Sequence, residues 1–275
     1  MNRLFVRALV ILLSSTGLAL AQPREAGPGN TKLTWYGHAA FRLITPAGHV
    51  LLIDPWISNP LNLHAKEDLA ALSKVDLILV SHGHSDHVGD MVAIAKQSRA
   101  RLVTSYDQAA AYSRYLAFPK EMSPETLGNV GGTLEFFDGE VKITLVPAVH
   151  GSTVDAKEGG RAVSYPAGNP VGFLIAIRNG PTLYHTGDTD AFGDMQMLRA
   201  AKVTLMLACI GDRYTMGPER AAEAVTLVQP ARVAAMHYGT FPTLTGTPAA
   251  FAAALKARGL LSHYQPLQLH ETLEL

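Results

Sequence analysis

Ten short apolar runs, rich in valine, isoleucine and leucine, recur along the chain and limit its fold more than any other feature. Their lengths, and the glycine, proline or aspartate residues that bound them, predict β-strands. The predicted strands cover residues 32–37, 39–44, 49–54, 76–82, 142–150, 171–177, 182–188, 203–210, 231–239 and 267–275.

Helix-like stretches lie between these runs, at 91–98, 106–117, 194–200, 217–229 and 247–259. Runs of strands alternate with single helices in both halves of the chain. This order predicts an α/β protein in which two mixed β-sheets pack on each other with helices outside, a four-layer αβ/βα sandwich. The polar segment 154–170, which is rich in glycine and proline, is predicted to be a surface loop.

The first 21 residues have the pattern of a secretory signal peptide. Arg3 and Arg7 precede an apolar run that is shorter than the roughly 20 residues of a membrane span, so no stable membrane anchor is expected after the leader is removed. A retained anchor is the alternative. We expect cleavage before Gln22, a flexible segment at 22–31, one large domain at 32–275, and a periplasmic or secreted protein.

The composition limits the partners. The 23 basic and 23 acidic residues balance, so nothing favours nucleic acid or a membrane surface as a partner. Cys209 is the only cysteine and lies in an apolar run, which indicates a buried core residue and excludes an internal disulfide. The sequence leaves homo-oligomer formation open.

Three histidines and an aspartate lie within the six residues 82–87, HGHSDH. A predicted strand runs into this cluster and a predicted helix leaves it, so it lies on a strand-to-helix loop, where proteins often place functional residues. From an extended backbone His82 and His84 can point the same way, and Gly83 between them allows close approach. Asp86 and His87 follow where the chain turns. Two pairs of ligands predict two metal positions close together.

Each metal needs three or four ligands, so others must come from distant segments. His150, Asp188 and His237 each end an apolar strand. A carboxylate can bridge two ions with its two oxygens, which an imidazole cannot do, so Asp188 is the natural bridge. Imidazole and carboxylate ligands suit borderline divalent metals. Two Zn²⁺ ions fit best, with Mn²⁺ or Fe²⁺ as alternatives.

The pattern H-x-H-x-D-H, followed by separate histidine, aspartate and histidine residues, resembles the metallo-β-lactamase superfamily. The stretches WYGHAAF, LLIDPW, YHTGDT, YTMGPERAAEAV and AMHYGTFP are similar to a narrower branch, the uncharacterised metal-dependent hydrolases related to L-ascorbate-6-phosphate lactonase. The resemblance covers nearly all of 32–275, which would therefore be a hydrolase domain. The expected leader departs from this branch, whose members mostly look cytoplasmic, and argues against a phosphorylated intracellular substrate.

The resemblance implies a metallo-β-lactamase fold and seven metal ligands. They would be His82, His84 and His150 for the first ion, Asp86, His87 and His237 for the second, and Asp188 between the two.

The resemblance also places His38 and His185 near the metals, where each would hydrogen-bond to a ligand and support catalysis. A satisfied core histidine is the alternative for both. Asp54 either orients a metal-bound histidine or caps a turn. Arg213 and Tyr214 follow a strand end, where the arginine either binds an anionic substrate group or remains solvated. No site role is expected for His49, His64, His263 and His270.

The ligand set predicts a metal-dependent hydrolase. A divalent ion lowers the pKa of bound water from 15.7 to about 7, so a hydroxide held by two ions would be the nucleophile. Asp86 is also expected to orient the attacking water. No G-x-S-x-G or H-E-x-x-H motif offers another mechanism. By resemblance, the bond cleaved is a lactone or other carboxylic ester of a small molecule.

Four alternatives stay open. A phosphodiesterase would use the same two-metal site. A β-lactamase is less favoured because the best-known metallo-β-lactamases carry cysteine where this chain has Asp188. A di-iron redox protein would normally need a flavin partner. A non-catalytic zinc-binding protein would be expected to hold its ligands on a flexible tract rather than at strand ends.

Overall fold

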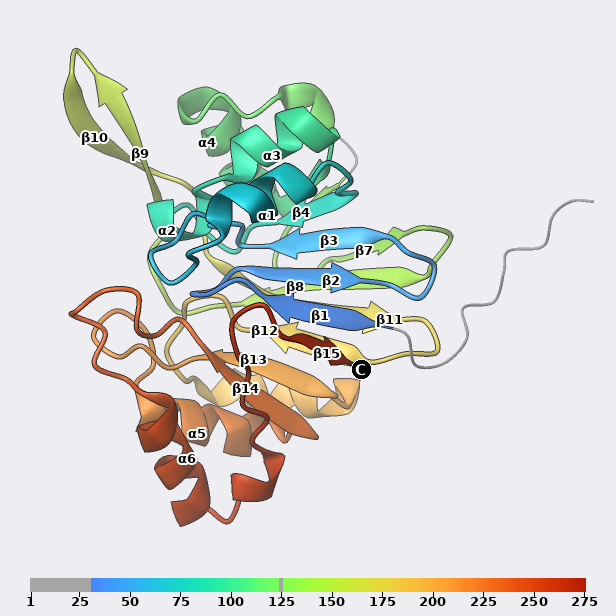
Figure 1. The fold of residues 1–275 in the computed structure, drawn as a ribbon, viewed down its shortest axis with the longest axis vertical. Helices are drawn as coiled ribbons and strands as arrows, with labels where there is room; N and C mark the ends of the chain where they lie inside the picture. The colour runs from blue at the N-terminus through green and yellow to red at the C-terminus, as the bar shows by residue number, and fades with distance from the viewer. Residues whose placement is uncertain (1–30, 124–125) are drawn as a thin grey trace, which may run out of the picture.

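The computed structural model describes residues 31–123 and 126–275 (Figure 1). The predicted signal peptide lies outside the described residues, as does the predicted flexible segment apart from Thr31. Within the two described ranges, no helix has both the length and the apolar character needed to span a membrane.

Two mixed sheets stack face to face at the centre of the molecule (Figure 1). The seven-stranded sheet has the order β15-β1-β2-β3-β4-β5-β6. Its strands are β1 (Lys32–Trp35), β2 (Phe41–Ile44), β3 (Val50–Ile53), β4 (Leu77–Leu79), β5 (Arg101–Ser105), β6 (Leu127–Gly128) and β15 (Thr272–Glu274). The six-stranded sheet has the order β14-β13-β12-β11-β8-β7. Its strands are β7 (Thr133–Phe136), β8 (Val141–Pro147), β11 (Val171–Ile177), β12 (Thr182–His185), β13 (Leu205–Cys209) and β14 (Arg232–Met236).

Helices cover the outer face of each sheet (Figure 1). Side chains of α3 (Met91–Ser98) and α4 (Tyr106–Tyr115) pack on the seven-stranded sheet, and α1 (Ala65–Ala71) lies beside them. The six-stranded sheet is covered by α5 (Pro218–Val228) and α6 (Pro248–Ala257). The predicted four-layer αβ/βα sandwich is therefore confirmed.

The central strands are buried on both faces. In β4, Leu77 and Leu79 enter the apolar layer between the sheets, whereas Ile78 enters the layer beneath the helices, and all three are fully buried. Side chains of a strand alternate between faces, so burial on both sides requires a continuous apolar run. This packing fixes where each strand ends, and the next residues of β4, β8, β12 and β14 carry the polar side chains described below.

The prediction of a surface loop at 154–170 is wrong. Strands β9 (Thr153–Glu158) and β10 (Arg161–Pro166) form an antiparallel hairpin that projects from the body of the molecule (Figure 1). The turn consists of Gly159 and Gly160, both with positive φ, and a Gly-Gly pair favours a two-residue hairpin. The polar composition of the strands, most of whose residues are exposed, concealed this signal.

Two smaller differences concern short elements. The predicted helix at 194–200 is a 3₁₀ segment, η2 (Gly193–Ala201). Strands β5, β6 and β7 were not predicted from the sequence; β6 has two residues, and the side chains of β7 are mostly exposed or half-buried.

Gly246 joins the loop after β14 to the end of β13. Its amide donates to the Gly211 carbonyl at 3.1 Å, and a Cβ at Gly246 would lie 1.7 Å from the Ile210 carbonyl oxygen. We expect Gly246→Ala to lower the free energy of unfolding by about 1–3 kcal/mol, because the backbone must move to admit the methyl group. Gly193→Ala, which meets nothing within 4 Å, is the control. Denaturant unfolding measures both, and equal stabilities would contradict the expectation.

Candidate metal centre

The 82–87 cluster lies where β4 leads into the short helix α2 (Ser85–Val88). His82 and His87 are fully buried, and His84 precedes the helix with an extended backbone, φ −65° and ψ 147°. Gly83 packs against the base of the β9–β10 hairpin, because a Cβ there would lie 2.7 Å from the Thr153 carbonyl oxygen. The expected close approach at Gly83 is therefore present.

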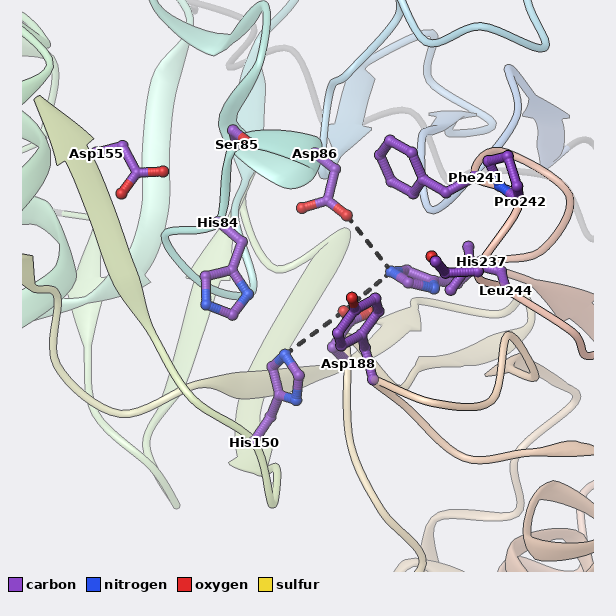
Figure 2. Close-up of a pocket in the computed structure, with 12 residues that line it drawn as sticks. His84, Ser85, Asp86, His150, Asp155, Asp188, His237, Phe241, Pro242 and Leu244 are labelled. Atoms are coloured by element: carbon purple, nitrogen blue, oxygen red, sulfur yellow. Dashed lines mark ion pairs between the residues drawn. The ribbon is translucent and has the colours of Figure 1, made fainter. Parts of the chain in front are cut away.

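Asp188 lies at the centre of the site (Figure 2). Its Oδ2 atom is 3.0 Å from His237 Nε2 and 3.3 Å from His87 Nε2. The same oxygen lies 3.6 Å from His150 Nε2 and 3.8 Å from His82 Nε2. These residues follow β12, β14, β4 and β8, so one carboxylate oxygen is surrounded by imidazoles from both sheets.

The ligand atoms form two groups with Asp188 between them. In the first, ligand atoms of His82, His84 and His150 lie within 4.8 Å of one another, with His82 Nε2 2.9 Å from His84 Nδ1. The second group holds Asp86, His87 and His237 within the same limit, together with His38. All seven predicted ligands thus come together in the division that the resemblance implied.

Several buried atoms of this cluster fit a metal site. His87 Nε2, His237 Nε2 and Asp188 Oδ1 are buried without a hydrogen-bond partner. Unpartnered buried polar atoms are costly, and most buried polar groups in proteins are paired. Imidazole nitrogens and carboxylate oxygens are also the ligands that zinc and similar divalent ions take. The residues present therefore fit metal ions at this position.

Asp54 orients two of the metal-site histidines, one in each group. Its Oδ2 atom accepts a hydrogen bond from His87 Nδ1 at 2.8 Å and another from Ser81 Oγ at 2.6 Å. The Ser81 hydroxyl in turn lies 3.0 Å from His82 Nδ1. These contacts occupy Nδ1 of both rings and leave Nε2 facing Asp188. Of the two interpretations of Asp54, the structure shows the contact that orients a histidine.

His38 and His185 differ in their contacts. His38 Nε2 lies 3.0 Å from Asp86 Oδ2, and its Nδ1 lies 2.7 Å from Thr240 Oγ1, so His38 holds a predicted ligand. His185 is not brought to the metal centre. Its Nε2 donates to the Ala39 carbonyl and its Nδ1 accepts from the Gly187 amide, which supports the turn that carries Asp188.

The charges of the two groups differ. Burial lowers the pKa of His82, His84 and His150, so this group is neutral and ready to bind a cation. Burial also opposes a charge on His237, but the Asp188 carboxylate outweighs it and raises the pKa of His237 to about 9. The same carboxylate, aided by Asp54 and Asp86, raises the pKa of the buried His87 imidazole.

The imidazoles lower the pKa values of the two carboxyl groups, Asp86 and Asp188. Burial alone would raise the pKa values of Asp86 and Asp188. The neighbouring imidazoles of His87 and His237 outweigh this effect and hold both pKa values well below the ordinary range. Both carboxyls are therefore ionised at neutral pH. A metal ion in the second group must displace protons from histidines, not from carboxylates.

Five of the seven predicted ligands form the floor of a pocket of about 730 Å³ (Figure 2): His84, Asp86, His150, Asp188 and His237. Asp155 of β9 lines one wall, and Tyr214 and the loop 241–244 also line the pocket. Arg213 does not line it; its guanidinium lies over the Tyr214 ring, 5.5 Å from the centroid. None of the described residues that line this pocket is a lysine or an arginine.

Comparisons with known proteins identify the family and the fold. The family model described as the beta-lactamase superfamily domain matches residues 49–238. The solved structure of Igni18, a metallo hydrolase from the archaeon Ignicoccus hospitalis, superposes with a TM-score of 0.76 at 31% identity, covering 90% of this chain and 98% of that one. An isothiocyanate hydrolase from Delia radicum gut bacteria, at 21% identity and a TM-score of 0.64 over 88% of this chain and 98% of that one, shares the fold. Fold and site together define a metal-dependent hydrolase of the metallo-β-lactamase superfamily.

Sequence relatives narrow the assignment. A UPF0173 metal-dependent hydrolase of Thermodesulfovibrio yellowstonii is 46% identical over 277 residues and covers 100% of both chains. Another, from Anaeromyxobacter dehalogenans, is 49% identical over 251 residues, 90% of this chain and 88% of the relative. The chain belongs to the UPF0173 family of metal-dependent hydrolases. The predicted superfamily and its uncharacterised hydrolase branch are confirmed.

Asp54→Asn tests how the histidines are oriented. We expect the metal dissociation constant to rise about 10–100-fold, because the amide cannot accept hydrogen bonds from both His87 and Ser81 on one oxygen while it keeps the Ser81 amide contact. Competition with a chromogenic chelator measures the affinity. Glu140→Gln is the matched control, since Glu140 is a buried carboxylate that bonds to Ala47 away from the site. Equal affinity in Asp54→Asn and wild type would refute this role.

Metal stabilisation should depend on pH. In the metal-free protein the folded pKa of His237 is about 9, against 6.5 ordinarily. Its contribution to stability is therefore complete below pH 6.5 and is lost as the pH rises through about 9. Metal excludes this proton, so the Tm difference between metal-loaded and metal-stripped protein should increase from pH 6.5 to pH 9. Calorimetry over this range measures it, and a difference that does not change with pH would contradict the linkage.

Proposed function

We propose that this metal-dependent hydrolase binds two zinc ions and cleaves a lactone or other carboxylic ester of a small molecule. The observation that carries the proposal is the position of Asp188, whose single Oδ2 atom lies 3.0–3.8 Å from four imidazole nitrogens. A carboxylate between two histidine groups suits a pair of ions better than a single ion. Five histidines and two aspartates as ligands favour zinc.

The side chains of the pocket support hydrolysis. When bound, a pair of divalent ions would lower the pKa of a coordinated water to about 7 and polarise the scissile carbonyl. Asp86 lines the pocket with 20% of its side chain exposed, and its Oδ2 atom faces His38 and His237. We assign the remaining oxygen of Asp86 to orienting the attacking water. His38, which is itself held by Thr240, keeps this carboxylate in place.

The pocket wall favours an ester or lactone over a phosphodiester. Proteins that bind phosphate groups generally surround them with arginine or lysine. Neither residue type is found among the described residues that line this pocket, and the one aspartate there that is not a predicted metal ligand, Asp155, adds a negative charge. The wall therefore offers nothing that would bind the non-reacting part of an anionic substrate, and this supports a substrate without phosphate.

Replacing a ligand from each part of the site tests the proposal. We expect Asp188→Ala and His84→Ala to abolish hydrolysis and to lower bound metal below two ions per chain, because each removes a metal contact. Plasma mass spectrometry gives the metal content. His64→Ala is the control, since His64 is exposed and lies outside the metal-site groups of the described residues. Full activity in either ligand variant would refute the site.

Substrate class is tested with γ-lactones, p-nitrophenyl esters and bis(p-nitrophenyl) phosphate, each with and without chelator. The proposal expects turnover of a lactone or ester that chelation removes and zinc restores. Turnover of the phosphodiester alone would overturn the ester assignment and leave the metal site intact. Metal binding without turnover of any of these compounds would favour a non-catalytic zinc protein.

A further inference from the structure

The pocket above the metal centre is lined by one carboxylate, Asp155, that is not a predicted metal ligand. Asp155 lines the pocket from β9, and its side chain accepts a hydrogen bond from Ser164 Oγ on β10. Across residues 31–123 and 126–275, Asp155 forms no ion pair with lysine or arginine. Lys157, two residues further along the same strand face, does not line the pocket.

An apolar surface faces this carboxylate. Figure 2 shows Phe241 and Pro242 on the other side of the pocket from Asp155, with the metal ligands between them. Phe241 is 37% exposed and stacks on Trp56, with ring centroids 5.7 Å apart. Tyr214, which also lines the pocket, is 55% exposed. Exposed aromatic rings around a pocket commonly bind the apolar part of a ligand.

The pocket thus has three chemically distinct parts: a floor of predicted metal ligands, an aromatic wall, and a wall with the carboxylate of Asp155, which has no ion-pair partner among the described residues. On the basis of the proposed ester hydrolysis, we infer that the substrate carries an ammonium group that pairs with Asp155. An apolar segment of the substrate lies on Phe241 and Tyr214, and the scissile carbonyl lies over the ligands. Asp155 is then a specificity-determining residue, because it attracts a cationic substrate and repels an anionic one.

Three p-nitrophenyl esters of nearly equal length test this assignment: the cationic 6-aminohexanoyl, the neutral heptanoyl and the anionic adipyl ester. The expected order of kcat/KM for the zinc-loaded wild type is cationic, neutral, anionic. Exposed ion pairs contribute up to about 1 kcal/mol, which corresponds to a preference of about five-fold at each step. A flat order, or a preference for the adipyl ester, would overturn the inference.

Variants of Asp155 test whether its carboxylate causes the preference for the cationic ester. Asp155→Asn keeps the size of the side chain and should reduce the cationic-to-neutral ratio of kcat/KM by about five-fold, through KM. Asp155→Lys should make the adipyl ester the better of the two charged substrates. Glu158→Gln is the matched control, since it removes one negative charge from an exposed residue of the same strand that points to the other face. An equal loss of preference in Glu158→Gln would show a general effect of net charge and reject the role of Asp155.

A binding measurement separates this inference from the proposed reaction. Hydroxamic acids bind zinc whether or not the protein cleaves esters, so titration calorimetry compares 6-aminohexanohydroxamic acid with heptanohydroxamic acid. A dissociation constant about five-fold lower for the amino compound, lost in Asp155→Asn, supports the inference even if no ester is hydrolysed. Ester hydrolysis with equal affinities for both hydroxamates would leave the proposed function standing and reject the inference. Failure of both compounds to bind would reject the inference, whereas the proposed function would still be decided by ester turnover with and without chelator.

Discussion

The contact of one Asp188 oxygen with four imidazoles is the interaction on which the site depends. The histidines follow β4, β8 and β14, and Asp188 follows β12, so strands of both sheets must end at the same edge. The apolar layer between the sheets fixes this edge, because a strand that shifted by one residue would turn its buried side chains to the wrong face. The packing of the core therefore also determines where the metal ligands lie.

The metal-free site contains charges that balance each other. His87 and His237 have raised pKa values because Asp86 and Asp188 lie beside them, and those carboxyls stay ionised for the same reason. Protons on His87 and His237 therefore balance the two carboxylates when no metal is bound. This balance explains how so many ligands can be buried together before any ion arrives.

Much of the fold and of the site could be predicted from the sequence. Buried strands such as β4 are continuous apolar runs that can be recognised in the sequence. The HGHSDH motif places several potential metal ligands within six residues, which indicates a metal site. The β9–β10 hairpin could not be predicted from its polar composition, because most of its residues are exposed and only a few, such as Val154 and Tyr165, pack against the core. The sequence left two interpretations open for Asp54, because its contact with His87 joins segments 33 residues apart. His185 shows the converse, since the histidine within the YHTGDT stretch bonds only to backbone.

Gly83 gives the site a further property. The arm that carries Asp155 begins against this residue, at a separation that admits no side chain. The wall that would select a substrate is therefore seated on the loop that holds the metal ligands, while the rest of the arm extends away from both sheets (Figure 1). Because only the base of the arm contacts the ligand loop, the rest of the arm can change in length and charge during evolution. New substrate specificities can then arise while the metal ligands stay the same.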